Sequence, residues 1–274
     1  MNPGSLPACV ERGQGDTVVV MLHGVGGGHA AFEATMSVLA AAGYRAVAWD
    51  APGYGASPLV IDQNGALTMG TMADALLQLV EVLGARRTVV VGHSMGGMIA
   101  QEACFARPGR FDGLVLFATS AAFGKPGGDW QREFLQSRFA ALDAGLGMAG
   151  LAPVLVGGML ALGAKPAARE AAVRMMASVP ESTYRAALAA IVSFNRLENL
   201  DRIDMPVLCL ACQEDKTAPP GVMEKMAGRL RHGQYASLAN AGHLGNMEQP
   251  VAFNEALMAY LRQHFPVQDA PAMV

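Results

Sequence analysis

Short apolar runs alternate along this chain with stretches in which apolar residues recur at helical spacing. The runs are continuously apolar or rich in β-branched residues, a pattern typical of strands that are buried on both faces. They lie at Thr17–Leu22, Arg45–Trp49, Thr88–Val91, Leu114–Ala118 and Val207–Ala211. Helices are predicted at Thr71–Leu83, Met95–Ala106 and Pro250–Phe265. This alternation predicts an α/β fold with a mostly parallel central sheet and helices on both faces.

The alternation stops between residues 121 and 204, where apolar patches, glycine and proline follow one another without strand signals. We interpret this block as a helical insertion into a core of residues 1–120 and 205–265, followed by a loose tail at 266–274. The uncharged stretch Ala144–Ala164 is long enough to cross a bilayer, but its several glycines and Pro153 make it a poor continuous helix. We expect short apolar helices that cover another surface, and no membrane contact.

Composition narrows the class of protein. Hydrophobic residues make up 52% of the chain against 16% charged residues, which predicts a large buried core. The formal net charge is only −3 and no basic cluster occurs, so a nucleic-acid partner is not expected. The first twenty residues lack the basic start and apolar core of a signal peptide, which favours a cytoplasmic protein with reduced thiols.

Cys209 and Cys212 have the spacing of half a zinc site or of a redox motif. No second pair of ligands at similar spacing occurs, and both residues fall in or next to a predicted strand. We therefore favour two buried thiols that act as small apolar side chains, and predict no metal site.

The strongest chemical motif is Gly92-His93-Ser94-Met95-Gly96, placed where a predicted strand turns directly into a helix. In this G-x-S-x-G context the strained turn lifts the serine hydroxyl clear of the sheet, and the glycines let strand and helix approach closely. The pattern predicts that Ser94 is a nucleophile. The alternative is a glycine-rich turn with an idle serine.

A serine hydroxyl needs a base, and the base needs an orienting acid. His243 lies in a polar turn before the last helix, and Asp215 directly follows a predicted strand. Glu214 is the rival acid, but adjacent side chains point in opposite directions. For His243 the alternative is a plain surface histidine. The order Ser94, Asp215, His243 is that of the α/β-hydrolase arrangement.

Negative charge that develops on a substrate carbonyl oxygen requires backbone N–H donors, an oxyanion hole. The glycine loop His23-Gly24-Val25-Gly26-Gly27-Gly28 follows a predicted strand, and we expect the amides of Val25 and Met95 to be the donors. A phosphate-binding loop is the alternative, but the Lys-Ser/Thr of a P-loop is missing.

Over residues 15 to 265 the chain resembles the α/β-hydrolase superfamily. The resemblance rests on His23-Gly24 with its glycines, on Asp50-Ala-Pro-Gly-Tyr-Gly-Ala-Ser57, on Gly92–Gly97, and on the pair Asp215 and His243. It implies that 121–204 is a cap over the active site, and that the family's first strand is lost because only Leu6–Arg12 precedes the first predicted strand. Haloalkane dehalogenases and epoxide hydrolases resemble the fold but carry Asp at the position of the serine, so Ser94 excludes their chemistry.

Within the superfamily the motifs around Asp215 and His243 look most like those of 3-oxoadipate enol-lactonases and related esterases. The oxyanion loop departs from that group, which often has Asn-Ser-Leu-Gly where this chain has His23-Gly-Val-Gly. Carbon–carbon bond hydrolases usually carry Gly-Pro-Gly in this loop and Trp after the histidine, where this chain has Leu244.

These observations predict a cofactor-independent serine hydrolase that is a monomer or homodimer. It would cleave a small-molecule ester, lactone or related carbonyl substrate through Ser94, His243 and Asp215 and an acyl-enzyme. The alternatives are a carbon–carbon bond hydrolase and a non-catalytic binding protein of the same fold. The substrate is expected to contact His23, Gly24, Trp130, Met148, Leu151, Leu155, Met159 and Leu244. This set predicts a mostly apolar pocket, with any single anionic group held at its edge by Arg132, Arg138 or Arg185. The alternative is that the apolar residues of the insertion only pack against the sheet and do not contact the substrate.

Overall fold

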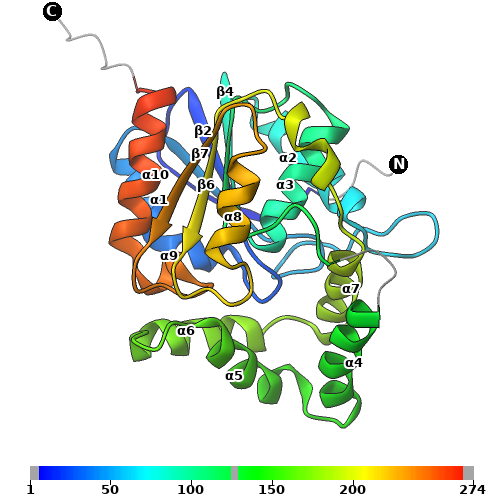
Figure 1. The fold of residues 1–274 in the computed structure, drawn as a ribbon. Helices are drawn as coiled ribbons and strands as arrows, with labels where there is room; N and C mark the ends of the chain where they lie inside the picture. Colours follow the sequence, from blue (N-terminus) through cyan, green and yellow to red (C-terminus); the bar gives the residue numbers. More distant parts are fainter. Residues whose placement is uncertain (1–5, 125–128, 268–274) are drawn as a thin grey trace, which may run out of the picture.

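The structure is a computed structural model that describes residues 6–124 and 129–267. Within these residues, seven strands form one sheet in the order β1-β3-β2-β4-β5-β6-β7, and only β1 runs antiparallel to its neighbour (Figure 1). Their bounds are β1 Cys9–Arg12, β2 Thr17–Leu22, β3 Arg45–Trp49, β4 Arg87–His93, β5 Gly113–Phe117, β6 Val207–Cys212 and β7 Gly233–Leu238. All five predicted strands are present. β1 lies within the short N-terminal stretch and is the one strand described before β2.

Helices cover both faces of the sheet, as the apolar runs predict. One side carries α1 (Glu33–Ala41) and α10 (Pro250–His264), and the other carries α2 (Met69–Leu83), α3 (Met95–Ala106) and α8 (Pro220–Ala227) (Figure 1). In β2, successive side chains point to opposite faces of the sheet, and both faces are covered by helices, so every position of the strand must be apolar. Val18, Val20 and Leu22 belong to the cluster under α2 and α3, whereas Val19 and Met21 belong to the cluster under α1 and α10.

Among the described residues, four α-helices lie between β5 and β6, across the carboxyl ends of the strands (Figure 1). These insertion helices are α4 (Asp129–Asp143), α5 (Gly147–Met159), α6 (Pro166–Ala177) and α7 (Glu181–Val192). A short helix, η2 (Leu197–Arg202), leads back into β6. Buried insertion residues such as Ala152 and Leu188 belong to the same apolar cluster as α2 and α3, so the insertion and the core share one packed interior.

The expectation of several short helices across Ala144–Ala164 is wrong, because most of this stretch forms the single helix α5, which contains Pro153. The proline removes one hydrogen bond of the helix. Packing of the helix's apolar residues into the shared cluster offsets this loss. No helix in the described part of the chain is long and apolar enough to cross a membrane. The tail predicted at 266–274 lies outside the described residues from position 268 onward.

The two cysteines of β6 are buried and free, on opposite faces of the sheet. Cys209 belongs to the cluster beneath α8, and Cys212 to the cluster beneath α10. Their thiols therefore point away from each other, as expected for residues three apart in a strand. Each thiol packs as a small apolar side chain in its cluster.

Candidate active site

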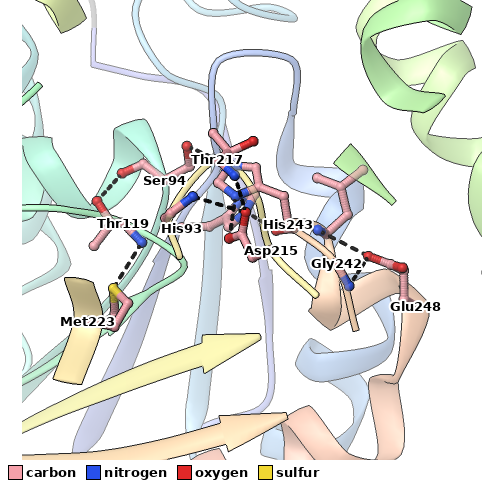
Figure 2. A network of polar contacts seen from close by, with 11 residues as sticks. His93, Ser94, Thr119, Asp215, Thr217, Met223, Gly242, His243 and Glu248 are labelled. Atoms are coloured by element: carbon pink, nitrogen blue, oxygen red, sulfur yellow. Dashed lines mark hydrogen bonds and ion pairs between the residues drawn. The ribbon is translucent and has the colours of Figure 1, made fainter. Parts of the chain in front are cut away.

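Three polar side chains from the carboxyl ends of the sheet meet beneath the insertion helices (Figure 2). Ser94 follows β4, Asp215 follows β6 and His243 follows β7. His243 Nε2 lies 3.0 Å from Ser94 Oγ, and His243 Nδ1 lies 2.7 Å from Asp215 Oδ2. The structure thus brings together the three residues that the sequence pattern selected, over separations of 149 and 28 residues.

Ser94 stands on a strained turn between β4 and α3, with φ 52° and ψ −116°. The turn requires glycine on both sides, since a Cβ on Gly92 would lie 2.5 Å from the Gly96 carbonyl oxygen and one on Gly96 would lie 2.3 Å from that of Leu22. The Thr119 hydroxyl holds the turn by donating to the Ser94 carbonyl at 2.7 Å (Figure 2). Local sequence and one distant hydroxyl therefore present the Ser94 side chain above the sheet.

Asp215 is fixed as the partner of the histidine. Its Oδ1 accepts the backbone N–H groups of Thr217 at 2.7 Å and Ala218 at 3.0 Å, which leaves Oδ2 for His243. Burial raises the pKa of Asp215, but the hydrogen bond and charge of His243 and the two N–H donors outweigh burial, so the pKa lies below its usual range. The Glu214 side chain turns away and accepts the N–H of Leu162 at 3.2 Å. The geometry therefore favours Asp215 over the rival acid.

His243 is itself held at both backbone ends. Its N–H donates to the Met159 carbonyl at 2.7 Å, and its carbonyl accepts the Nε2–H of His93 at 2.8 Å. Burial, together with the charge of His243, lowers the pKa of His93 to about 3, so His93 is neutral and acts only as a donor. His93, within the serine motif, is thus a positioning residue for the His243 backbone.

Glu248 is a further part of this network that sequence reasoning missed (Figure 2). Its Oε1 accepts the N–H groups of Gly242 at 3.1 Å and Leu244 at 3.2 Å, on either side of His243. Its Oε2 accepts the N–H of Ala161 at 2.8 Å, just past the end of α5. Burial raises the pKa of Glu248, and the three N–H donors oppose that shift. A glutamate in a polar turn gives no sequence signal that distinguishes this buried role from exposure.

The glycine loop after β2 is ordered by His23. Burial lowers the pKa of His23 to about 4, so its ring is neutral, with Nε2 accepting the N–H of Ala51 at 2.9 Å. The other ring nitrogen, Nδ1, then carries the proton and donates to the Gly24 carbonyl at 2.8 Å. Gly27 N–H donates to the same carbonyl at 2.9 Å.

Two backbone N–H groups near Ser94 are left available. A trans peptide is planar, so fixing the Gly24 carbonyl also fixes the Val25 N–H on the opposite side of that peptide. The Met95 N–H belongs to the first turn of α3, where helix donors lack intrahelical partners. Within the described residues neither group has an acceptor, and both residues line the same cavity as Ser94. The arrangement meets the requirements of an oxyanion hole.

The cavity above Ser94 has a volume of about 350 Å³ and a mostly apolar wall. The core supplies the turn at Ser94 and the glycine loop, and all four insertion helices contribute side chains. Apolar lining residues include Met98, Leu155, Met159, Met176, Leu188 and Ile191. Phe134 and the methionines of α6 were not singled out by the sequence pattern, because helical spacing does not identify which face of a helix meets the cavity. Phe123, which precedes α4, was not singled out either.

Half of the expected substrate contacts lie on this wall, namely Gly24, Leu155, Met159 and Leu244. His23 does not, because its ring is engaged with Ala51 and Gly24. Met148 and Leu151 are buried in the apolar cluster, since only the C-terminal half of α5 reaches the cavity. Trp130 is 54% exposed and packs against Phe123 and Phe134 outside the lining.

Metal ligands are not gathered at this site. In residues 6–124 and 129–267, no three His, Cys, Asp or Glu side chains are grouped so that they could hold a metal ion. The groups closest to the reacting position are the Ser94 hydroxyl, the His243 imidazole, the Asp215 carboxylate and two free backbone amides. This set is suited to nucleophilic attack on a carbonyl carbon and to stabilising the resulting oxyanion.

Comparison with known proteins agrees with this architecture. Residues 17–250 match the family model described as the alpha/beta hydrolase fold. BpoC of Mycobacterium tuberculosis, named provisionally as a non-heme bromoperoxidase, is 30% identical over 260 residues, covering 91% of this chain and 95% of BpoC. RutD of Variovorax paradoxus, named provisionally as a carbamate hydrolase, is 28% identical over 253 residues, covering 89% of this chain and 91% of RutD.

Solved structures give the same picture. A thermophilic esterase from Thermogutta terrifontis, solved with malate bound, superposes with a TM-score of 0.85 at 27% identity, covering 96% of each chain. The enol-lactonase of Burkholderia xenovorans superposes with a TM-score of 0.82 at 21% identity, covering 94% of this chain and 97% of the other, and shows likeness of fold.

Proposed function

The chain belongs to the α/β-hydrolase family, whose members similar to it include hydrolases, and on that premise we propose that it is a serine hydrolase. Its substrate is an ester, a lactone or a related carbonyl compound, cleaved through an acyl-enzyme on Ser94. The observation that carries this proposal is the hydrogen-bonded row from Ser94 Oγ through His243 to Asp215. The Thermogutta esterase supports ester chemistry in particular.

In the first half-reaction Ser94 Oγ attacks the substrate carbonyl carbon while its proton passes to His243 Nε2, 3.0 Å away. The carbonyl electron pair moves onto the oxygen, which accepts hydrogen bonds from the Val25 and Met95 amides. Asp215 stabilises the imidazolium that forms. Collapse of the intermediate breaks the bond to the leaving oxygen, which takes the proton from His243, and an acyl-Ser94 ester remains.

The second half-reaction repeats these steps with water. His243 removes a proton from a water molecule as it attacks the acyl carbon, and the same two amides hold the second oxyanion. Ser94 Oγ then leaves and recovers its proton from His243. The carboxylic acid product departs and the enzyme returns to its starting state. Because Asp215 holds Nδ1–H, the imidazole keeps Nε2 free to accept a proton in both halves.

The decisive experiment replaces Ser94 by Ala. With a p-nitrophenyl ester as substrate, kcat should fall by several powers of ten, while the free energy of unfolding stays nearly unchanged. A fluorophosphonate probe should label the wild type and not Ser94→Ala, with the modified peptide containing Ser94. Ser120, another serine on the cavity wall, donates to the Ala122 carbonyl at 2.9 Å, so Ser120→Ala should still be labelled.

Wild-type turnover in Ser94→Ala would exclude the acyl-enzyme. Absence of both turnover and labelling in the wild type would favour a binding protein of the same fold. A substrate panel that adds enol lactones and ring-cleavage dienones distinguishes ester or lactone hydrolysis from carbon–carbon bond cleavage. A preference for the dienones would assign the chain to the latter.

A further inference from the structure

One arginine side chain faces the mostly apolar cavity. Arg138 of α4 is the only Lys, Arg, Asp or Glu among the described residues that line it. The cavity also contains Ser94 and His243, so Arg138 and the proposed nucleophile share one enclosed space. Placing a guanidinium against apolar side chains is costly unless a partner satisfies its charge.

Arg138 has no carboxylate partner in the described parts of the chain. Its recorded polar contacts are a long hydrogen bond of 3.4 Å from Nη1 to the Ser137 hydroxyl and a contact with the Tyr184 hydroxyl. The two other arginines that the sequence offered for an anionic group differ in this respect. Arg132 pairs with Asp129, and Arg185 pairs with Asp143 and Glu181. Arg138 therefore faces the cavity with most of its N–H donors unused.

The guanidinium also lies against an aromatic ring. Its central carbon lies 4.9 Å from the ring centroid of Phe134, another lining residue. This cation–π contact attracts the guanidinium to the ring face and needs no hydrogen-bond acceptor. Half-burial on the cavity wall and the contact with Phe134 together hold the guanidinium at this place before any ligand binds.

Tyr184 of α7 adds a second polar group at the same place. Its side chain is buried and lines the cavity beside Arg138. Burial raises the pKa of the Tyr184 phenol, and the charge and hydrogen bond of Arg138 oppose that shift. The phenol therefore keeps its proton near neutral pH. Its oxygen accepts from Arg138 and its O–H remains a donor for a ligand.

We propose that Arg138 and Tyr184 form a carboxylate subsite, and that the substrate of Ser94 is an ester or related compound that carries one anionic carboxylate. A planar fork with one positive charge matches a planar carboxylate with one negative charge. A doubly charged phosphate would require further cations, and the described lining holds none. The apolar wall accommodates the carbon chain between the carboxylate and the reacting carbonyl.

This inference rests on the proposed function, and two matched pairs of substrates test it. In the first pair the charge lies on the acyl chain, with the p-nitrophenyl monoester of adipic acid compared with p-nitrophenyl hexanoate. In the second it lies on the leaving group, with para-carboxyphenyl hexanoate compared with para-carbamoylphenyl hexanoate. The readout is the ratio of kcat/KM for the anionic to the neutral member. We expect a ratio above one for at least one pair.

Arg138→Met should lower that ratio about 10- to 100-fold, the range for loss of a charge-assisted hydrogen-bonded contact. Arg138→Lys keeps the charge but loses the fork, so its ratio should be intermediate. Arg132→Met is the matched control, because Arg132 lies on the same helix with its side chain 75% exposed, and its ratio should equal that of the wild type. Equal ratios in Arg138→Met and wild type, or an equal fall in Arg132→Met, would overturn the subsite.

A measurement without turnover separates this inference from the proposed function. In the Ser94→Ala background, calorimetry should show that the monoamide of adipic acid binds more tightly than hexanamide, and that adding Arg138→Met removes the difference. If both amides bind alike, the subsite is wrong even though esters are hydrolysed. If the charged amide is preferred but Ser94→Ala still turns esters over at the wild-type rate, the subsite stands and the proposed serine mechanism is wrong.

Discussion

The carboxylate of Glu248 accepts the backbone N–H of Ala161 at 2.8 Å, although the two residues are 87 positions apart. The other oxygen of this carboxylate accepts the N–H groups of Gly242 and Leu244, which flank His243. His243 N–H in turn donates to the Met159 carbonyl at the end of α5. One buried side chain therefore ties the loop of the proposed general base to the insertion helix that forms part of the cavity wall.

Replacing Glu248 by Gln should disturb both connections. A glutamine has a single acceptor oxygen, and its NH₂ group would face at least one of the three N–H donors. We expect a loss of about 1 to 3 kcal/mol in the free energy of unfolding, the cost of an unsatisfied buried polar group, and a lower kcat. Urea denaturation and steady-state kinetics measure the two effects. Glu255→Gln, an exposed change on α10, should alter neither. Wild-type stability in Glu248→Gln would contradict the role assigned to this carboxylate.

The dependence of activity on pH should show one rising limb. Burial holds the pKa of His23 at about 4 and that of His93 at about 3, so both stay neutral from pH 5 to 8. If His243 is the general base, kcat/KM for a neutral ester should increase across this interval, in which an imidazole ordinarily loses its proton. A pH profile on p-nitrophenyl butyrate in buffers of constant ionic strength tests this. Activity that is constant from pH 5 to 8 would argue against an imidazole base.

The identity of the acid can be tested by a pair of adjacent substitutions. Asp215→Asn should keep the fold and lose most activity, because an amide at this place favours the wrong tautomer of His243. Glu214→Gln should have the smaller effect, since the Glu214 carboxylate reaches Leu162 and not His243. If Glu214→Gln is the more damaging change, the assignment of Asp215 is wrong.

Asp215 also predicts how stability responds to acid. Its pKa is lower in the folded protein than the ordinary value of 3.8, so folding favours the ionised form. The resulting stabilisation is fully present above the unfolded pKa and is lost as the pH falls through the folded pKa. The difference in unfolding free energy between wild type and Asp215→Asn should therefore shrink below about pH 4. Denaturation at several pH values measures it, and a difference that grows with acid would contradict the direction of the shift.

The apolar wall predicts a preference for longer acyl chains. In a series of p-nitrophenyl esters from acetyl to decanoyl, kcat/KM should rise over several carbons, with each buried methylene contributing up to about 0.8 kcal/mol. The rise should stop where the chain fills the cavity of about 350 Å³. Flexible methionines such as Met159 and Met176 let the wall adapt to chains of different shape. A flat series, or a steep preference for acetyl, would mean that the insertion helices do not contact the acyl group.

The sequence alone determined five of the seven strands, the turn that carries Ser94, and the three residues that meet there. A strand buried on both faces must be apolar at every position, and β2, with both of its faces covered by helices, shows this directly. The strained turn at Ser94 needs its flanking glycines because of contacts within a few residues. Asp215 follows a predicted strand, whose carboxyl end lies at the same edge of the sheet as Ser94. His243 was selected from its polar turn and from the chain order of the three residues, because the strand before it, β7, was not predicted. Each of these inferences depends on local geometry repeated along the chain.

Only the tertiary structure decided which side chains surround the substrate and what holds the site in place. Helical spacing cannot say which face of a helix meets a cavity, so Met148 and Trp130 were expected on a wall to which Met175 and Tyr184 belong. Three arginines were candidates for an anionic group, and only packing leaves Arg138 facing the cavity without a carboxylate. Glu248 gave no signal at all, because its partners lie on segments that meet only after folding. The burial of a side chain and its polar partners depend on segments that are distant in the sequence and meet only in the folded protein. The pattern of residues next to it in the chain therefore does not reveal them.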